Sequence, residues 1–212
     1  MEVVVVGGHG KIALKLLALL AERGDRARGV IRDPAQAPDL EAVGTEAVVC
    51  DIEREELTDA VKGVDAVVFA AGAGPGSGTE RKRTVDYGGA VKLIEAAKAN
   101  AVARYVMVSS IGAHDPDSAS GTFRAYLQAK ADADRELADS GLDYTIVRPG
   151  MLSDDAGTGL VDLSTELGRR SAVPREDVAA VLAEALLVPG TVGKTFECFG
   201  GEIPVAEAVR SL

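Results

Sequence analysis

The feature that most restricts the fold of this chain is a glycine-rich turn between an apolar strand and a helix. The run Val3 to Val6 leads into Gly7-Gly8-His9-Gly10, and Lys11-Ile12-Ala13 then opens a stretch with helical spacing. Residues without side-chain bulk let the backbone approach a pyrophosphate, which the N–H groups and the positive dipole end of a helix attract. The order strand, turn, helix is therefore typical of dinucleotide-binding sheets.

Two glycine patterns fit this turn. Gly8, Gly10 and Ala13 match the common dinucleotide fingerprint, whereas Gly7, Gly10 and Ala13 match the spacing found in short-chain reductases. A tight strand-to-helix turn without any ligand is the alternative. On the binding interpretation, the contacts come from Gly7, Gly8, His9, Gly10, Lys11 and Ile12.

Strands and helices alternate along most of the chain. Short apolar, β-branched runs predict strands, and stretches with helical spacing lie between them. A doubly wound, Rossmann-type α/β fold with a parallel sheet and helices on both faces accounts for this order. The predicted strands are 2–6, 26–31, 46–50, 66–70, 104–109 and 144–147, and the predicted helices are 11–23, a short one near Leu40, 53–62, 83–99 and 123–139.

The pattern weakens after Gly150. An irregular segment is followed by a predicted helix over 176–187, a strand over 195–199 and a helix from Pro204. We therefore expect one domain over 1–212, with a dinucleotide-binding core in 1–150 and a small substrate-side appendage in 151–212.

Charge and cysteine content limit the partners and the compartment. The formal net charge of −10 disfavours nucleic-acid and anionic-membrane partners, which need clustered cations. Cys50 and Cys198 are too few for a disulfide framework, and no apolar helix is long enough to cross a bilayer. We expect a cytoplasmic protein, a monomer or a homodimer, with a small-molecule substrate and no metal ligands.

The segments after the predicted strands supply the remaining cofactor contacts. Arg32 follows the second strand, where a basic residue accepts the 2′-phosphate of NADP and an acidic one binds the 2′-hydroxyl of NAD, so NADP(H) is favoured over NAD(H). Asp51 and Ile52 are placed to meet the adenine. The small residues Ala70, Ala71 and Gly72 let the backbone pass close to the ribose.

A candidate catalytic set lies on the fifth strand and the helix after it. Tyr126 and Lys130 are four apart and share one helix face, and Ser109-Ser110 ends the neighbouring strand. A Tyr phenol, whose pKa is ordinarily about 10, acts as a proton donor to a carbonyl when an ammonium stabilises its anion. His114 lies in the loop after this strand, where we expect it to be exposed to solvent and not to act as a second proton donor.

The segments GGHGKIA, VSSIGA, YLQAK and LDYTIVRPG together resemble the atypical short-chain dehydrogenase/reductase superfamily, in particular its small NAD(P)H-binding bacterial members of the YhfK-like type. Biliverdin-reductase-B-like flavin reductases and NmrA-like redox sensors are relatives of that group. The resemblance implies that Ser110, Tyr126 and Lys130 are the catalytic residues, that Lys130 also binds the nicotinamide ribose, and that Pro149, Gly150 and Met151 lie beside the nicotinamide. Ala13 departs from the last glycine of the family motif.

Three functions remain open at this stage. The first is an NADP(H)-dependent oxidoreductase acting on a small carbonyl-like or flavin or quinone acceptor. The second is an NADPH-sensing regulatory protein without catalysis, and the third is an NAD-dependent epimerase that uses the same residues.

Overall fold

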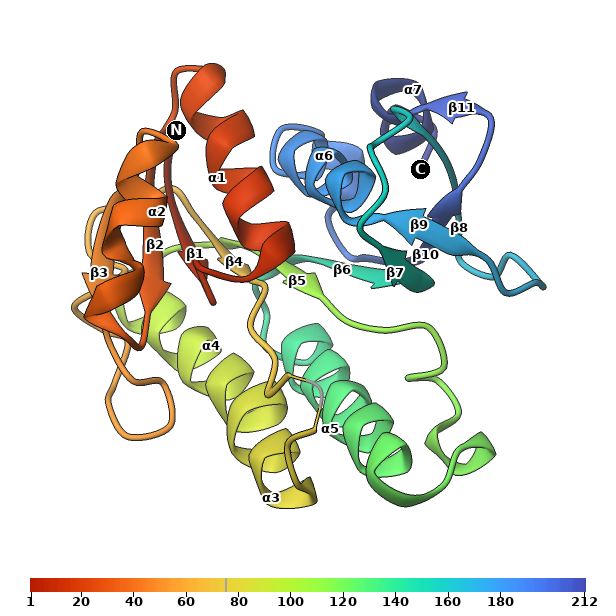
Figure 1. The fold of residues 1–212 in the computed structure, drawn as a ribbon, viewed down its shortest axis with the longest axis horizontal. Helices are drawn as coiled ribbons and strands as arrows, with labels where there is room; N and C mark the ends of the chain where they lie inside the picture. The colour runs from red at the N-terminus through yellow and green to blue at the C-terminus, as the bar shows by residue number, and fades with distance from the viewer. Residues whose placement is uncertain (75) are drawn as a thin grey trace.

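The chain builds a nine-stranded sheet with the strand order β11-β8-β10-β6-β5-β4-β1-β2-β3 (Figure 1). This computed structural model describes residues 1–74 and 76–212. Neighbouring strands are parallel from β3 through to β10, so their carboxyl ends meet at one edge. The seven parallel strands are β1 (Glu2–Val6), β2 (Arg26–Ile31), β3 (Glu46–Val49), β4 (Ala66–Phe69), β5 (Arg104–Val108), β6 (Asp143–Pro149) and β10 (Lys194–Gly200).

Helices cover both faces of the sheet (Figure 1). The side chains of β1 point alternately to the two faces of the sheet. Val3 and Val5 belong to the hydrophobic core on one face, and Val4 and Val6 belong to the core on the other. The predicted doubly wound, Rossmann-type fold is confirmed. The first face carries α1 (Lys11–Glu22), α2 (Ala37–Ala42), α6 (Arg175–Ala185) and α7 (Val205–Arg210), and the second carries α4 (Ala90–Ala99) and α5 (Gly121–Ala138).

The segment after Gly150 is more regular than its sequence predicts. Strand β8 (Leu160–Ser164) pairs antiparallel with β10 and with β11 (Ile203–Pro204), so this part of the chain extends the main sheet. A separate two-stranded sheet joins β7 (Met151–Ser153) to β9 (Ala172–Pro174). These strands are only two to five residues long, and their partners are far away in sequence, so local periodicity does not reveal them.

The prediction of a helix over 53–62 is wrong. Turns occupy this stretch, although Leu57, Ala60 and Val61 are buried as their helical spacing suggested. The Asp51 side chain accepts a hydrogen bond from the Glu53 N–H, and the Glu55 side chain accepts one from the Asp51 N–H. Local acceptors of this kind satisfy backbone donors without a helix.

The helix predicted over 83–99 has an irregular start. A short helix, α3 (Thr79–Arg81), leads into a π-helical stretch, η2 (Lys82–Gly89), before α4 begins. The π-helical geometry is common where a functional side chain must be placed. No helix among residues 1–74 and 76–212 is long and apolar enough to cross a membrane.

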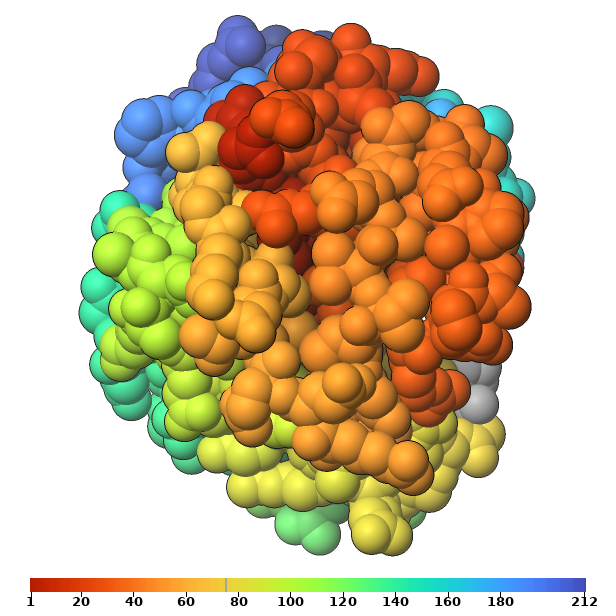
Figure 2. Space-filling view, turned by 90° about the vertical axis from the view of Figure 1, so that its left-hand side faces the viewer, coloured from red at the N-terminus to blue at the C-terminus, as the bar shows by residue number. Residues whose placement is uncertain are grey.

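Seen from the β3 edge, the surface is formed mainly by the first part of the chain, coloured red to yellow, with the blue C-terminal segments at the far margin (Figure 2). Residues at the carboxyl ends of β1, β2, β3 and β4 line one pocket, and the site described next begins there.

Candidate functional site

Glycine is required at two positions of the turn after β1. Gly7 has a φ of +84°, and a Cβ there would lie 2.6 Å from the Ala71 Cα. A Cβ on Gly8 would lie 2.8 Å from the Gly29 Cα on β2. The Gly10 N–H closes the turn on the Gly7 carbonyl at 2.8 Å, and no side chain caps α1 at Gly10. The first turn of α1 therefore presents its backbone N–H groups without a capping side chain, as an anion site requires.

A pocket of about 290 Å³ opens beside this turn. Its walls come from the ends of β1, β2, β3 and β4, which is where a doubly wound sheet binds ligands. Most of the predicted cofactor residues line it, namely Gly7, His9, Gly10, Arg32, Asp51, Ile52, Ala70, Ala71 and Gly72. Glu53 and Arg81 also line this pocket. Sequence reasoning missed Glu53, and it favoured a solvated helix start over a cofactor contact for the run Arg81-Lys82-Arg83.

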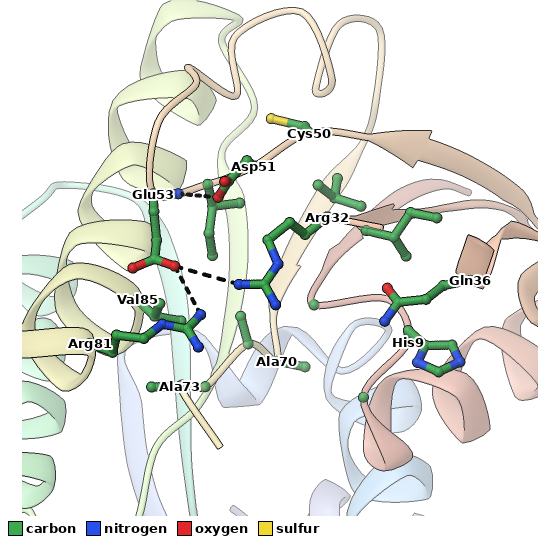
Figure 3. A pocket seen from close by; sticks show the side chains of 17 residues that line it. His9, Arg32, Gln36, Cys50, Asp51, Glu53, Ala70, Ala73, Arg81 and Val85 are labelled. Atoms are coloured by element: carbon green, nitrogen blue, oxygen red, sulfur yellow. Dashed lines mark hydrogen bonds and ion pairs between the residues drawn. The ribbon is translucent and has the colours of Figure 1, made fainter. Parts of the chain in front are cut away.

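Glu53 lies between two arginines in this pocket (Figure 3). Its Oε2 atom is 2.9 Å from Arg81 Nη2 and 3.7 Å from Arg32 Nη1. The hydrogen bond from Thr84 and the charges of both arginines hold the pKa of Glu53 below its usual value, although burial opposes them. The predicted Arg32 therefore lies in the pocket, but it is already paired with a carboxylate.

A second pocket, of about 600 Å³, shares the Ala70, Ala71 and Gly72 wall with the first. Tyr126 and Lys130 of α5 line it, together with Ser109, the exposed Phe123 and Ile12. The Lys130 ammonium is 6.0 Å from the centre of the Tyr126 ring. The candidate catalytic pair thus lies next to the pocket beside the glycine turn.

Lys130 is held by a buried ion pair that the sequence reasoning did not identify. Its Nζ is 3.6 Å from Asp86 Oδ1 and donates to the Val108 carbonyl at 3.1 Å. Asp86 lies in the π-helical stretch, and its side chain has no solvent exposure. The helical spacing of Lys82, Val85, Asp86 and Gly89 is a usable signal, because it places a carboxylate on the buried stripe.

The two serines after β5 have different surroundings. Ser109 is buried and lines the pocket of Tyr126, whereas Ser110 is half-buried and its hydroxyl donates to the Ile111 carbonyl at 3.1 Å. Both serines and Tyr126 line a third pocket, of about 850 Å³, which also contains the predicted Pro149, Gly150 and Met151. The structure thus brings Ser110, Tyr126 and the segment after β6 to one cavity.

Behind Ser109 lies a second buried ion pair. Arg148 Nε donates to Asp134 Oδ2 at 2.9 Å, which gives Arg148 a structural partner. Burial raises the pKa of Asp134, although the charge of Arg148 opposes this effect. Among the described residues, three buried side-chain atoms make no hydrogen bond: Asp86 Oδ1, Ser109 Oγ and Asp134 Oδ1.

Three predicted or considered residues lie outside these pockets. Gly8 is buried against Gly29, so its role is to allow close packing beneath the turn. The exposed Lys11 pairs with Asp154, which also binds Arg175. His114 is exposed, in agreement with its expected exposure to solvent.

The fold and the paired pockets define a Rossmann-type nucleotide-binding protein. A profile of the NAD(P)H-binding family matches residues 7–189, and this chain belongs to that family. It is 38% identical over 215 residues to the Bacillus subtilis protein named "Uncharacterized sugar epimerase YhfK", with 100% of both chains covered. The agreement supports the resemblance to atypical short-chain dehydrogenases/reductases.

Two further relatives carry the names of enzymes. A solved structure from Bacillus halodurans, named for an NAD-dependent epimerase/dehydratase, superposes with a TM-score of 0.96 at 42% identity and covers 100% of both chains. Sanguinarine reductase from Eschscholzia californica is 27% identical over 261 residues, covering 99% of this chain and 93% of its own. Within residues 1–74 and 76–212, no group of His, Cys, Asp and Glu side chains is arranged to hold a metal ion.

Proposed function

We propose that this protein is an NADP(H)-dependent oxidoreductase that reduces a small carbonyl-like, flavin or quinone acceptor. One observation carries the proposal: Tyr126 and Lys130 line a pocket that shares a wall with the pocket beside the glycine turn. A proton donor and an ammonium are thereby placed next to the position expected for a nicotinamide. The reductase name of the Eschscholzia californica relative supports the same class of reaction.

Each candidate residue has a separate task in the proposed reaction. When bound, the dinucleotide supplies or accepts a hydride. Tyr126 gives a proton to the oxygen of a carbonyl or quinone acceptor, and Lys130 stabilises the resulting phenolate. Ser110 orients the acceptor oxygen by a hydrogen bond. Ser109, Phe123 and Leu152 line both pockets that contain Tyr126 and form the walls on which the acceptor rests.

The preference for NADP(H) is part of this proposal. Arg32 lines the pocket at the end of β2, where a guanidinium meets the 2′-phosphate. A thermal-shift comparison of NADPH, NADH, FMN and no ligand tests it, because a ligand that binds only the folded state raises its stability in proportion to affinity. We expect the largest shift with NADPH. Equal shifts with NADPH and NADH would remove the role of Arg32.

Epimerisation is the second candidate function, and the names of the two most similar relatives described above favour it. A reaction through a transient keto intermediate returns its hydride and keeps its NAD bound. Release of nucleotide from the purified protein by denaturation separates the two functions. Stoichiometric NAD would support the epimerase, whereas cofactor-free protein that oxidises added NADPH would support the reductase.

We also expect residues 1–212 to behave as one domain, because a single sheet runs from β3 to β11 across the boundary at Gly150. Two buried free cysteines fit a reducing, cytoplasmic compartment.

A further inference from the structure

A second guanidinium, that of Arg81, faces the pocket beside the glycine turn, opposite Arg32. Arg81 comes from α3, after β4, whereas Arg32 follows β2, so the two approach from different walls (Figure 3). Both guanidiniums pair with the same atom, Glu53 Oε2. Two cations therefore share one carboxylate oxygen. Neither guanidinium makes the bidentate contact with the Glu53 carboxylate that its planar shape allows.

Glu53 is the best-fixed member of this group. Its other oxygen, Oε1, accepts a hydrogen bond from Thr84 Oγ1 at 2.7 Å, and its backbone N–H is bound by Asp51. The Glu53 side chain is 22% exposed, against 41% for Arg81 and 59% for Arg32. A partly buried carboxylate, bound by Thr84, thus pairs with two more exposed cations at the edge of the pocket.

We infer that Arg81 is a second ligand of the 2′-phosphate of NADP(H), and that Glu53 is a resident anion that competes with this phosphate for Arg81 and Arg32. The inference rests on the proposed NADP(H) function and extends it. A phosphate offers three acceptor oxygens and about two negative charges, so it satisfies both guanidiniums better than one carboxylate oxygen does. The phosphate must, however, displace the contacts of Glu53 and tolerate its charge. Glu53 therefore lowers a preference for NADP(H) that the two arginines create.

The test uses the adenosine end of the cofactor alone. Isothermal titration calorimetry of the full chain with 2′,5′-ADP and with 5′-AMP, at one ionic strength, isolates the 2′-phosphate. We expect Arg81→Ala to weaken 2′,5′-ADP about tenfold, which is what one charge-assisted hydrogen bond contributes, and to change 5′-AMP less than about twofold. Arg83→Ala is the matched control, because Arg83 is in the same segment but pairs with Asp132 outside the pocket. It should leave both affinities unchanged.

Glu53→Gln tests the competition. Glutamine keeps the size of the side chain and an acceptor for Thr84 but removes the charge. We expect 2′,5′-ADP to bind several times more tightly and 5′-AMP to bind as before. Glu56→Gln, at an exposed carboxylate on the same loop, is the control and should change neither affinity. In the double variant with Arg81→Ala, part of the gain should remain, because the charge of Glu53 still competes with the phosphate for Arg32.

Several outcomes would overturn the inference. Weaker binding of 2′,5′-ADP by Glu53→Gln would make Glu53 an anchor of the arginines, not a competitor. Equal losses for both nucleotides in Arg81→Ala would place Arg81 on a group that both share and not on the 2′-phosphate. If Arg81→Ala fails to fold, Arg81→Lys keeps the charge without the fork and should still weaken 2′,5′-ADP selectively. A wild-type protein that binds both nucleotides equally would refute the proposed NADP(H) preference itself, and the inference with it.

Discussion

The Lys130 ammonium and the Asp86 carboxylate form a buried ion pair at 3.6 Å, with side-chain exposures of 4% and 0%. The pair joins α5 to the π-helical stretch after β4. Lys130 also donates to the Ala71 carbonyl at 3.5 Å, and Asp86 accepts from the Ala73 N–H at 3.1 Å. The wall between the two pockets is therefore held by the same charges that place Lys130 beside Tyr126.

Removing one partner of this pair should be strongly destabilising. Asp86→Leu leaves an uncompensated ammonium in the interior, and Lys130→Met leaves an uncompensated carboxylate, so we expect each to cost roughly 3–5 kcal/mol of unfolding free energy. The double variant should cost far less than the sum, because it buries no unpaired charge. Urea unfolding of the four proteins measures this coupling. Additive losses would show that the pair is not energetically linked.

Tyr126→Phe should separate binding from chemistry. The variant removes one hydroxyl from a residue that lines the second and third pockets but not the pocket beside the glycine turn. We therefore expect the Kd for NADPH to remain within about twofold of wild type, while turnover of an identified acceptor falls by at least about 100-fold, as for loss of a general acid. Tyr144→Phe, which alters a tyrosine outside all three pockets, is the matched control. Full activity of Tyr126→Phe would exclude its role as proton donor.

The close approach at Gly8 makes a packing prediction. A Cβ at this position would lie 2.8 Å from the Gly29 Cα, and backbone on both sides leaves little freedom to relax. Gly8→Ala should destabilise the fold by about 1–3 kcal/mol and weaken NADPH, because it separates the turn from β2. Gly190→Ala is the control, since its Cβ would meet only the Val188 Cγ1 at an ordinary 3.9 Å. Thermal unfolding with and without NADPH checks both effects, and equal behaviour of the two variants would contradict the steric argument.

Residues whose roles depend on local pattern could be placed from the sequence. Successive apolar runs predicted the parallel strands, and the carboxyl ends of those strands placed the glycine turn, Arg32 and Asp51 in one pocket. The spacing of Tyr126 and Lys130 placed both on the pocket side of α5. These features follow from periods of two and 3.6 residues and from the topology that those periods imply.

Pairings between residues far apart in the sequence were missed. Glu53 and Arg81 are 28 positions apart, and their pairing depends on the loop after β3 folding as turns and not as the predicted helix. Asp86 pairs with Lys130, 44 positions later, only because the π-helical stretch places its side chain against α5. The short β7–β9 pair likewise depends on non-local contacts. Local periodicity can place a residue such as Asp86 on a buried face, but it does not show which distant residue is its partner.

The two cysteines should differ in their reaction with iodoacetamide. Burial and the nearby Asp177 raise the pKa of Cys198 to about 12, and burial together with Glu55 and Asp51 raises the pKa of Cys50. Only the thiolate reacts, and an elevated pKa keeps the thiol protonated at pH 8. Both cysteines should therefore react more slowly than a solvent-exposed cysteine with an ordinary pKa. Cys50 lines the pocket beside the glycine turn, whereas Cys198 is fully buried on β10. Raising the pH from 8 to 9 should therefore accelerate the labelling of Cys50, and NADPH should suppress it, while Cys198 should react only after unfolding. Peptide mass spectrometry of timed samples measures both rates, and rapid labelling of native Cys198 would contradict its burial.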